Sequence, residues 1–247
     1  MSNINDTYFD GYYKDIWRTI IPEVLTTREV DFITPYFNLK PNNKILDIMC
    51  GYGRHALALA RKGMTVTAID NLAEYIKEIK EIAQKENLPV TAIQSDVINY
   101  KADSDFDLAL CMGNSLNFFN ADDTFDIIKA VAGHLKTGGK FLINSWSLAE
   151  IVSKNFKEKN ESLIAGMKFL TESKYLYNPT RIETQSTIIA PDGTVETKTG
   201  IDYIFTTTEI EIMLNKAGFK INEMYSIPGK KKFEEGEPRI YIIAEKK

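Results

Sequence analysis

The stretch DIMCGYGRH, residues 47–55, places two glycines one residue apart, directly after a short apolar run. Glycine lets a backbone approach a ligand closely and adopt a positive φ angle, so this loop could hold a nucleotide-containing cofactor. Gly51, Gly53 and Ala56 fit the G-x-G-x-x-G/A fingerprint of dinucleotide-binding proteins. Asp70 lies nineteen positions beyond Gly51, about where an acid would meet a ribose. A nicotinamide-dependent oxidoreductase is therefore one hypothesis that the loop supports.

Three aspartates, Asp47, Asp70 and Asp96, end three successive predicted strands and help to distinguish two cofactors. A pyrophosphate favours the free N–H groups of a helix start, without an adjacent carboxylate. S-adenosylmethionine carries an ammonium, a carboxylate and a sulfonium but no phosphate, so Asp47 could meet its amino-acid end directly or through water. Asp70 could accept hydrogen bonds from both ribose hydroxyls, and Asp96 could face the exocyclic amine of an adenine. Together the three acids favour S-adenosylmethionine, because a nicotinamide enzyme usually has only the second.

The elements that must position these residues alternate between strand and helix. Apolar runs predict strands at 44–50, 64–70, 89–96, 106–113 and 140–146, with helices at 54–63, 72–87 and 121–139. A further helix at 206–219 precedes two strands, 219–227 and 238–246. This alternation predicts an α/β fold in which a doubly wound, mostly parallel sheet is covered by helices on both faces.

Two segments fall outside this alternation. Residues 5–39 have helical periodicity interrupted by Pro22 and Pro35. Residues 147–165 indicate a helical connection, and 167–205 are rich in Thr, Tyr, Ile and Val with turn signals, which predicts an antiparallel meander of about three strands.

Several motifs resemble those of class I S-adenosylmethionine-dependent methyltransferases. ILDIMCGYGRHALALARKGMTVTAID resembles the first two motifs of that family, SDV the third, and FDLALCMGNSLNFF the fourth. LKTGGKFLINSW is similar to the fifth motif, and AGF…RIYIIAEK resembles the antiparallel last strand pair. The resemblance covers roughly 40–147 and 206–247. One departure is Met49, which stands where the family often has a glycine, so space beside the ligand is reduced.

The resemblance implies a Rossmann-like, seven-stranded sheet and three regions. We expect an N-terminal helical cap at 1–40, a cofactor-binding domain at 41–147 and 206–247, and an antiparallel β lid, inserted after strand five, at 148–205. The general arrangement resembles bacterial small-molecule methyltransferases such as the glycine and amino-sugar N-methyltransferases. Near relatives often carry an Arg before the last helix, where this chain has Tyr203, which weakens the case for an anion site there.

The expected cofactor residues come from the loops that follow the strands and from the N-terminal cap. They are Asp47, Met49, Cys50, Gly51, Gly53, Arg54, Asp70, Asn71, Leu72, Asp96, Val97, Met112, Gly113, Tyr13 and Trp17. Arg54 could pair with the cofactor carboxylate or begin its helix in solvent. Tyr13 and Trp17 could place ring faces near the sulfonium or form one packed helix stripe. Asn114 and Ser115 are the expected catalytic residues facing the methyl group, with a helix-capping turn as the alternative.

Composition and charge exclude several other classes. The 247 residues carry a formal net charge of −4, which argues against a surface that grips nucleic acid. No apolar run approaches a membrane span, no signal pattern opens the sequence, and the two cysteines favour a reducing compartment, so we expect a cytoplasmic protein. The two distant histidines predict no metal site.

The sequence thus predicts metal-independent methyl transfer from S-adenosylmethionine to the N- or O-nucleophile of a small molecule, by a monomer or homodimer. Methyl transfer is an in-line displacement, in which the protein mainly aligns the reactants and excludes water. The alternatives are an NAD-dependent oxidoreductase and a non-catalytic S-adenosylmethionine-binding protein. An RNA methyltransferase is disfavoured by the charge and by the absence of an appended RNA-binding module.

Overall fold

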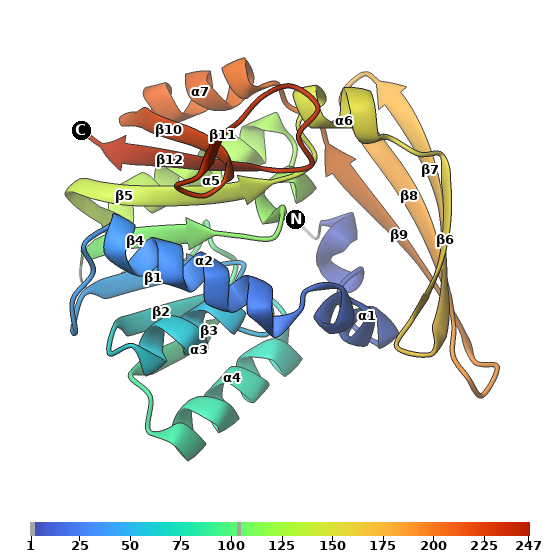
Figure 1. Cartoon of the computed structure of the whole chain (residues 1–247), viewed down its shortest axis with the longest axis horizontal. Helices are drawn as coiled ribbons and strands as arrows, with labels where there is room; N and C mark the ends of the chain where they lie inside the picture. Colours follow the sequence, from blue (N-terminus) through green and yellow to red (C-terminus); the bar gives the residue numbers. More distant parts are fainter. Residues whose placement is uncertain (1–2, 103–104) are drawn as a thin grey trace.

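The computed structural model describes residues 3–102 and 105–247, which form a large and a small β-sheet with helices around them (Figure 1). The strands of the large sheet are β1 (Lys44–Ile48), β2 (Thr65–Asp70), β3 (Val90–Gln94), β4 (Phe106–Cys111), β5 (Leu135–Ser145), β10 (Phe219–Ile227), β11 (Lys231–Lys232) and β12 (Ile240–Lys246). Their order is β11-β10-β12-β5-β4-β1-β2-β3. Neighbours among β1–β5 are parallel, whereas β12 is antiparallel to both β5 and β10.

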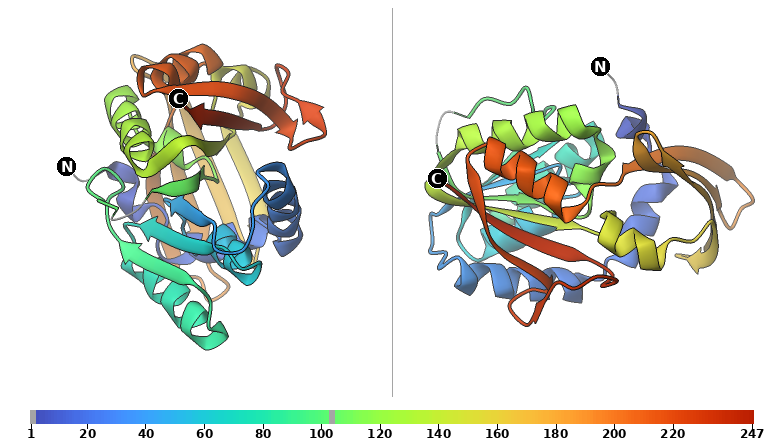
Figure 2. Two further views of the ribbon diagram at one scale, coloured as in Figure 1. Left: turned by 90° about the vertical axis from the view of Figure 1, so that its left-hand side faces the viewer. Right: turned by 90° about the horizontal axis from the view of Figure 1, so that it is seen from above.

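Helices cover both faces of this sheet. One face packs against α2 (Glu23–Tyr36), α3 (Arg54–Arg61) and α4 (Ala73–Glu86), and the other against α5 (Ala121–His134) and α7 (Thr207–Lys216). The right-hand view of Figure 2 shows the sheet between these two layers. Ligands of such sheets bind beyond the carboxyl ends of the strands where the order reverses, which here is between β1 and β4.

The small sheet stands beside the carboxyl ends of β4 and β5 (Figure 1). Its strands, in the order in which they pair, are β6 (Lys159–Ile164), β7 (Met167–Tyr177), β8 (Thr180–Ile189) and β9 (Val195–Tyr203), all antiparallel to their neighbours. The chain enters it from β5 through α6 (Ala149–Asn155) and returns directly into α7.

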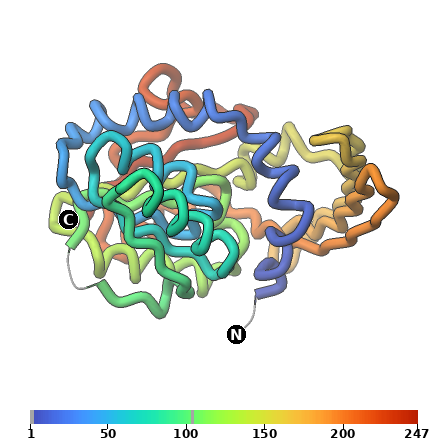
Figure 3. Tube along the Cα trace, turned by 90° about the horizontal axis from the view of Figure 1, so that it is seen from below, coloured from blue at the N-terminus to red at the C-terminus, as the bar shows by residue number. Residues whose placement is uncertain are grey.

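The N-terminal segment lies between the two sheets. It comprises a 3₁₀ turn, η1 (Ile4–Thr7), and helix α1 (Tyr12–Ile20), whose Ile16 is fully buried against Phe169 and Ile188 of the small sheet. The side chain of Asn5 bridges the two parts, because its Nδ2 donates to the carbonyls of both Phe118 and Ile201. Figure 3 follows this segment as it crosses between the large sheet and the small one.

The predicted α/β class, with a mostly parallel sheet covered on both faces, is confirmed. The strand count was wrong by one, because the charged pair Lys231–Lys232 adds an eighth strand at the edge of β10. Residues 167–205 form three antiparallel strands, β7, β8 and β9, as predicted. Residues 159–164, expected in a helical connection, form a fourth strand of this sheet, β6. β6 is exposed or half-buried along its whole length, so it has no hydrophobic alternation that could have revealed it. Pro35 lies inside α2 and does not interrupt it.

Candidate active site

The glycine loop between β1 and α3 turns through three left-handed residues. Met49, Gly51 and Gly53 have φ angles of 50°, 55° and 74°. A Cβ on Gly53 would lie 2.6 Å from Cγ1 of Ile79, so packing against α4 requires glycine there. A Cβ on Gly51 would meet no described atom within 4 Å, so this side of the loop is open to a ligand.

Met49 occupies the first of these left-handed positions, at a conformational cost of roughly 1–2 kcal/mol for a residue other than glycine. Its half-buried side chain packs against the hydrophobic cluster that includes Leu46 and Ile69. The residue that departs from the family pattern thus has apolar contacts that offset the strain.

We predict that Met49→Gly changes the free energy of unfolding by less than about 1 kcal/mol, because relief of strain offsets lost packing. Affinity for S-adenosylhomocysteine should stay within about threefold, since the side chain packs on the core. Urea unfolding and calorimetric titration measure the two quantities. A tenfold gain in affinity would instead mean that the methionine side chain takes up space needed by the ligand.

Two acids flank the loop. Oδ2 of Asp70 accepts from the Gly51 N–H at 2.8 Å, and its Oδ1 accepts from the Leu72 N–H at 3.0 Å. Asp47, at the end of β1, is only 1% exposed, and its Oδ2 is buried without a hydrogen-bond partner among the described residues. Burial raises the pKa of Asp47 to about 7, against the opposing charge of Arg54, and nearby Asp70 raises it further. An unpaired buried carboxylate of this kind favours a cationic partner.

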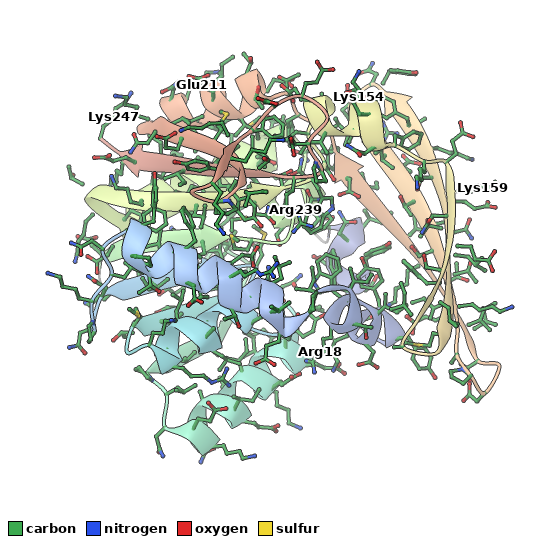
Figure 4. All side chains as sticks on the ribbon, viewed as in Figure 1. Arg18, Lys154, Lys159, Glu211, Arg239 and Lys247 are labelled. Atoms are coloured by element: carbon green, nitrogen blue, oxygen red, sulfur yellow. The ribbon has the colours of Figure 1, made fainter. Side chains whose placement is uncertain are left out.

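Helix α1 contacts the glycine loop through Arg18. The Arg18 guanidinium lies 4.8 Å from the centre of the Tyr52 ring and forms an ion pair with Glu78 of α4. Figure 4 labels Arg18 near α1, between the large sheet and the small one. Nε of Arg18 is buried without a partner in the described part of the chain. The loop therefore has one unsatisfied anionic atom, on Asp47, and one unsatisfied cationic donor, on Arg18. The amino-acid end of S-adenosylmethionine, with an ammonium and a carboxylate, matches both, so these residues fit that cofactor.

Trp17, the residue before Arg18, lies beside the loop that follows β4. Its Cζ2 would be 3.8 Å from a Cβ on Gly113, and its ring is 5.6 Å from that of Trp146. The ring of Tyr13 stacks on Trp17 with a centroid separation of 6.3 Å. Trp17 thus lies beside the end of β4, whereas Tyr13 also packs against the cluster of Ile16 and Phe169, as the alternative of a packed helix stripe expects.

Arg54 begins α3 but does not face solvent. Its Nη1 donates to Oε2 of Glu29 at 2.5 Å and to Oγ1 of Thr26 at 3.0 Å. Glu29, on α2 and 4% exposed, also accepts from His55 Nε2 at 2.9 Å and from the Tyr241 hydroxyl at 2.7 Å. This buried cluster joins α2, β12 and the start of α3, which directly follows Gly53 in the sequence. Its members are Glu29, Arg54, His55 and Tyr241.

The other expected cofactor residues lie around the same edge. Asn71 donates to Asp6 at 2.8 Å, and the Leu72 backbone caps α4. Asp96 is exposed and accepts from the Ile98 N–H at 3.0 Å, whereas Val97 and Met112 are buried. The half-buried Cys50 donates its N–H to the Ile69 carbonyl, and Gly113 donates to Asn144.

Asn114 is fully buried, and both ends of its amide are hydrogen-bonded. Its Oδ1 accepts from the N–H groups of Trp146 and Ser147 and from the Ser145 hydroxyl, and its Nδ2 donates to Ser147 and to Oδ1 of Asp202 at 2.7 Å. Ser115, next to it, donates back to the Met112 carbonyl. Asn114 therefore connects β4 and β5 to the small sheet through Asp202.

Asp202, on β9, is a residue that sequence reasoning missed. It is partly exposed and lines a cleft of about 400 Å³ together with Trp146, Ser147 and Thr184. This volume suits a small molecule. Burial raises the pKa of Asp202 to about 6, although Ser147 and Asn114 both donate to it. The only sequence signal was an acid in the segment IDYIFTT, beside the position where Tyr203 replaces the expected Arg.

The strand order, the antiparallel last pair, the glycine loop and the acids beside it define the class I S-adenosylmethionine-dependent methyltransferase fold. Residues 45–139 match a family model described as a methyltransferase domain. The ubiquinone biosynthesis O-methyltransferase of Rickettsia felis is 29% identical over 116 residues, 47% of this chain and 46% of that protein. The chain spans about half the length of the first curated relatives it matches.

Solved structures share the fold over nearly the whole chain. An S-adenosylmethionine-dependent methyltransferase from Clostridium acetobutylicum has a TM-score of 0.82 at 21% identity, over 95% of this chain and 96% of that one. An amino pentose methyltransferase from Micromonospora echinaspora, with S-adenosylmethionine bound, has a TM-score of 0.74 at 16% identity, over 96% and 98% of the two chains. Residues 45–139 are thus similar to a methyltransferase domain, and the chain has the fold of the class I S-adenosylmethionine-dependent methyltransferases.

Among residues 3–102 and 105–247, no helix is long and apolar enough to cross a bilayer. The same residues contain no group of three or more His, Cys, Asp or Glu side chains arranged to hold a metal ion.

Proposed function

We propose that this protein transfers a methyl group from S-adenosylmethionine to a small molecule bound in the cleft between the end of β5 and the small sheet. The observation that carries this proposal is Oδ2 of Asp47, which is buried beside the open glycine loop without a partner among the described residues, because such an atom favours a cationic ligand. When bound, the cofactor supplies a methyl group on a sulfonium. The chain's own contribution is to bind, align and exclude water.

The cofactor-binding roles follow from charge and position. Asp47 would hold the ammonium and Arg18 the carboxylate of the amino-acid end, while Arg54 remains paired with Glu29. Asp70 retains acceptor capacity for ribose hydroxyls, because a carboxylate offers about four lone-pair sites and two are used by N–H groups. Asp96 would meet the adenine from its exposed position. Trp17 would cover the cofactor next to Gly113.

The acceptor would lie in the cleft lined by Trp146, Ser147 and Asp202. We propose that residues 148–205 act as the substrate lid, residues 1–40 as the cap and the rest as the cofactor-binding domain. The amino pentose methyltransferase shares this overall fold and acts on a small sugar, which supports a small-molecule acceptor here. In this proposal the reaction needs no metal.

The direct test is incubation of the purified chain with S-adenosylmethionine labelled in its methyl group and with a panel of small amines, alcohols and phenols. We expect label to enter at least one acceptor and none to enter tRNA at any salt concentration. Label in tRNA, lost as the salt concentration rises, would point to a nucleic-acid substrate instead. Binding of the cofactor with no transfer to any acceptor would favour a binding protein.

Asp70→Ala tests the proposed cofactor site separately from methyl transfer. It removes the acceptor for the ribose and the anchor of the Gly51 N–H. We expect the binding free energy of S-adenosylhomocysteine to become less favourable by about 1–2 kcal/mol, because buried hydrogen bonds are lost. Unchanged affinity by calorimetry would remove Asp70 from the cofactor site.

A further inference from the structure

Asp202 is a carboxylate in the proposed acceptor cleft, and no cationic side chain of the described residues forms an ion pair with it. Both of its hydrogen bonds, from Asn114 Nδ2 at 2.7 Å and from Ser147 Oγ at 3.0 Å, end on Oδ1. Within the described residues, Oδ2 receives no hydrogen bond and no lysine or arginine forms an ion pair with Asp202. One oxygen is thus held by the protein, and the other is available to a ligand.

The position of Asp202 is fixed from both sides. Asn114, which orients it, directly follows Gly113 at the end of β4, where the cofactor site meets the cleft. The neighbouring Tyr203 carbonyl accepts from Asn117 at 2.8 Å, and the preceding Ile201 is bonded to Asn5 of the N-terminal segment through both its N–H and its carbonyl. Because these hydrogen bonds fix the position of the Asp202 carboxylate, it can hold a bound group in one orientation.

The surroundings of Asp202 suit an organic cation. Trp146 lines the same cleft and continues an aromatic row through Trp17 and Tyr13 to Tyr8, with successive ring centroids 5.6, 6.3 and 4.6 Å apart. Aromatic faces attract ammonium groups. The cationic side chain at the cleft is Lys157, which is exposed and forms no ion pair in the described part of the chain. Burial raises the pKa of Asp202 to about 6, below neutral pH, so the carboxyl is mostly ionised where it would meet a cation.

We propose that Asp202 selects the methyl acceptor by pairing its Oδ2 with a protonated amine, so that the substrate class is organic amines rather than alcohols or phenols. An ammonium has no lone pair, so the paired amine would first give one proton to Oδ2. Its nitrogen would then bond to the methyl carbon as the bond from that carbon to the sulfonium breaks, and S-adenosylhomocysteine would leave. This inference rests on the proposed function, since it concerns the acceptor of the same reaction. Asn114 and Ser147 act as positioning residues that hold the other oxygen of the carboxylate. The hydroxyls of Ser173 and Thr184, which also line the cleft, would contact polar substituents of the amine.

The test uses matched pairs that differ only in the charged group, cyclohexylamine against cyclohexanol and glucosamine against glucose. Each is titrated by calorimetry into the full chain saturated with S-adenosylhomocysteine at neutral pH. We expect at least one amine to bind about tenfold or more tightly than its neutral partner, as a charge-assisted hydrogen bond requires. Asp202→Asn should abolish that preference and leave the affinity for S-adenosylhomocysteine within about twofold.

Asp192→Asn, the same chemical change in an exposed turn of the small sheet, is the control and should keep the preference. A preference below about threefold in the wild-type chain would overturn the proposal, and so would an undiminished preference in a folded Asp202→Asn. The wild-type comparison alone decides the question if that variant does not fold. Failure of S-adenosylhomocysteine to bind would count against the proposed function, and titrating the amines into the chain alone would then decide the role of Asp202.

Discussion

Asp47→Asn is expected to weaken S-adenosylhomocysteine binding by about 100-fold, because it removes the charge that pairs with the cofactor ammonium. Asp47 is 1% exposed and its Oδ2 has no protein partner among the described residues, so its interaction with an ammonium would be poorly screened. The substitution preserves shape, and an asparagine can still accept the Ala56 N–H that lowers the pKa of Asp47. Calorimetric titration gives the change in affinity.

The same substitution should stabilise the empty protein at pH 8 by about 1–3 kcal/mol, since a buried unpaired charge is removed. The pKa of Asp47 is raised from 3.8 to about 7, so the folded state binds the proton more tightly than the unfolded chain between these values. The native protein therefore loses stability as the pH rises through this window. The gain from Asp47→Asn should shrink toward pH 5, where the folded carboxyl is already protonated.

Asp15→Asn, the same change at an exposed position of α1, should alter neither quantity. Urea unfolding at pH 5 and pH 8 measures the stabilities. Loss of stability at pH 8 together with unchanged cofactor affinity would mean that Asp47 has a purely structural role.

Glu29→Ala is expected to cost about 3–5 kcal/mol of folding free energy, the largest effect on stability that we predict. The change leaves the Arg54 guanidinium, only 11% exposed, without its countercharge and removes the acceptor of both His55 and Tyr241. Burial would raise the pKa of Glu29, but hydrogen bonds from His55 and Tyr241 and the charge of Arg54 outweigh it and lower that pKa. Urea unfolding at pH 7 measures the loss.

The pH dependence of this loss has a defined sign. Because the folded-state pKa of Glu29 lies below its ordinary value of 4.5, the carboxylate contributes its full stabilisation above that pH and loses it on acidification. The gap between wild type and Glu29→Ala should therefore narrow as the pH falls below 4.5. Glu23→Ala, on the exposed face of the same helix, is the control and should cost less than about 1 kcal/mol. If Glu29→Ala also cost less than about 1 kcal/mol, the buried cluster of Glu29, Arg54, His55 and Tyr241 would not stabilise the packing of α3.

The sequence could reveal the parts of the site that follow strands. Asp47 and Asp70 were found because each ends an apolar run, and strand order brings the ends of β1 and β2 side by side. The structure places both beside the glycine loop. Gly53 was expected from its motif, but the reason it must be glycine, contact with Ile79 of α4, is a tertiary one.

The parts that could not be foreseen depend on partners distant in sequence. Asp202 meets Asn114 across 88 positions, and it lies in the second half of β9, where the alternation between exposed and half-buried residues seen in the first half has ended. Glu29 lies in a helix of mixed polarity, where an acid normally faces solvent, and only its buried partners from α3 and β12 explain it. Asn114 was expected to face the methyl group, and the structure shows it fully buried with its amide donating to Ser147 and Asp202, partners that lie 33 and 88 positions away.

The central claim is that the glycine loop is built for S-adenosylmethionine and not for a dinucleotide. The most direct test is calorimetric titration of the full chain with S-adenosylhomocysteine and, separately, with NAD. We expect one-to-one binding of S-adenosylhomocysteine at about micromolar Kd or tighter, and no detectable binding of NAD. Binding of NAD without binding of S-adenosylhomocysteine would contradict it.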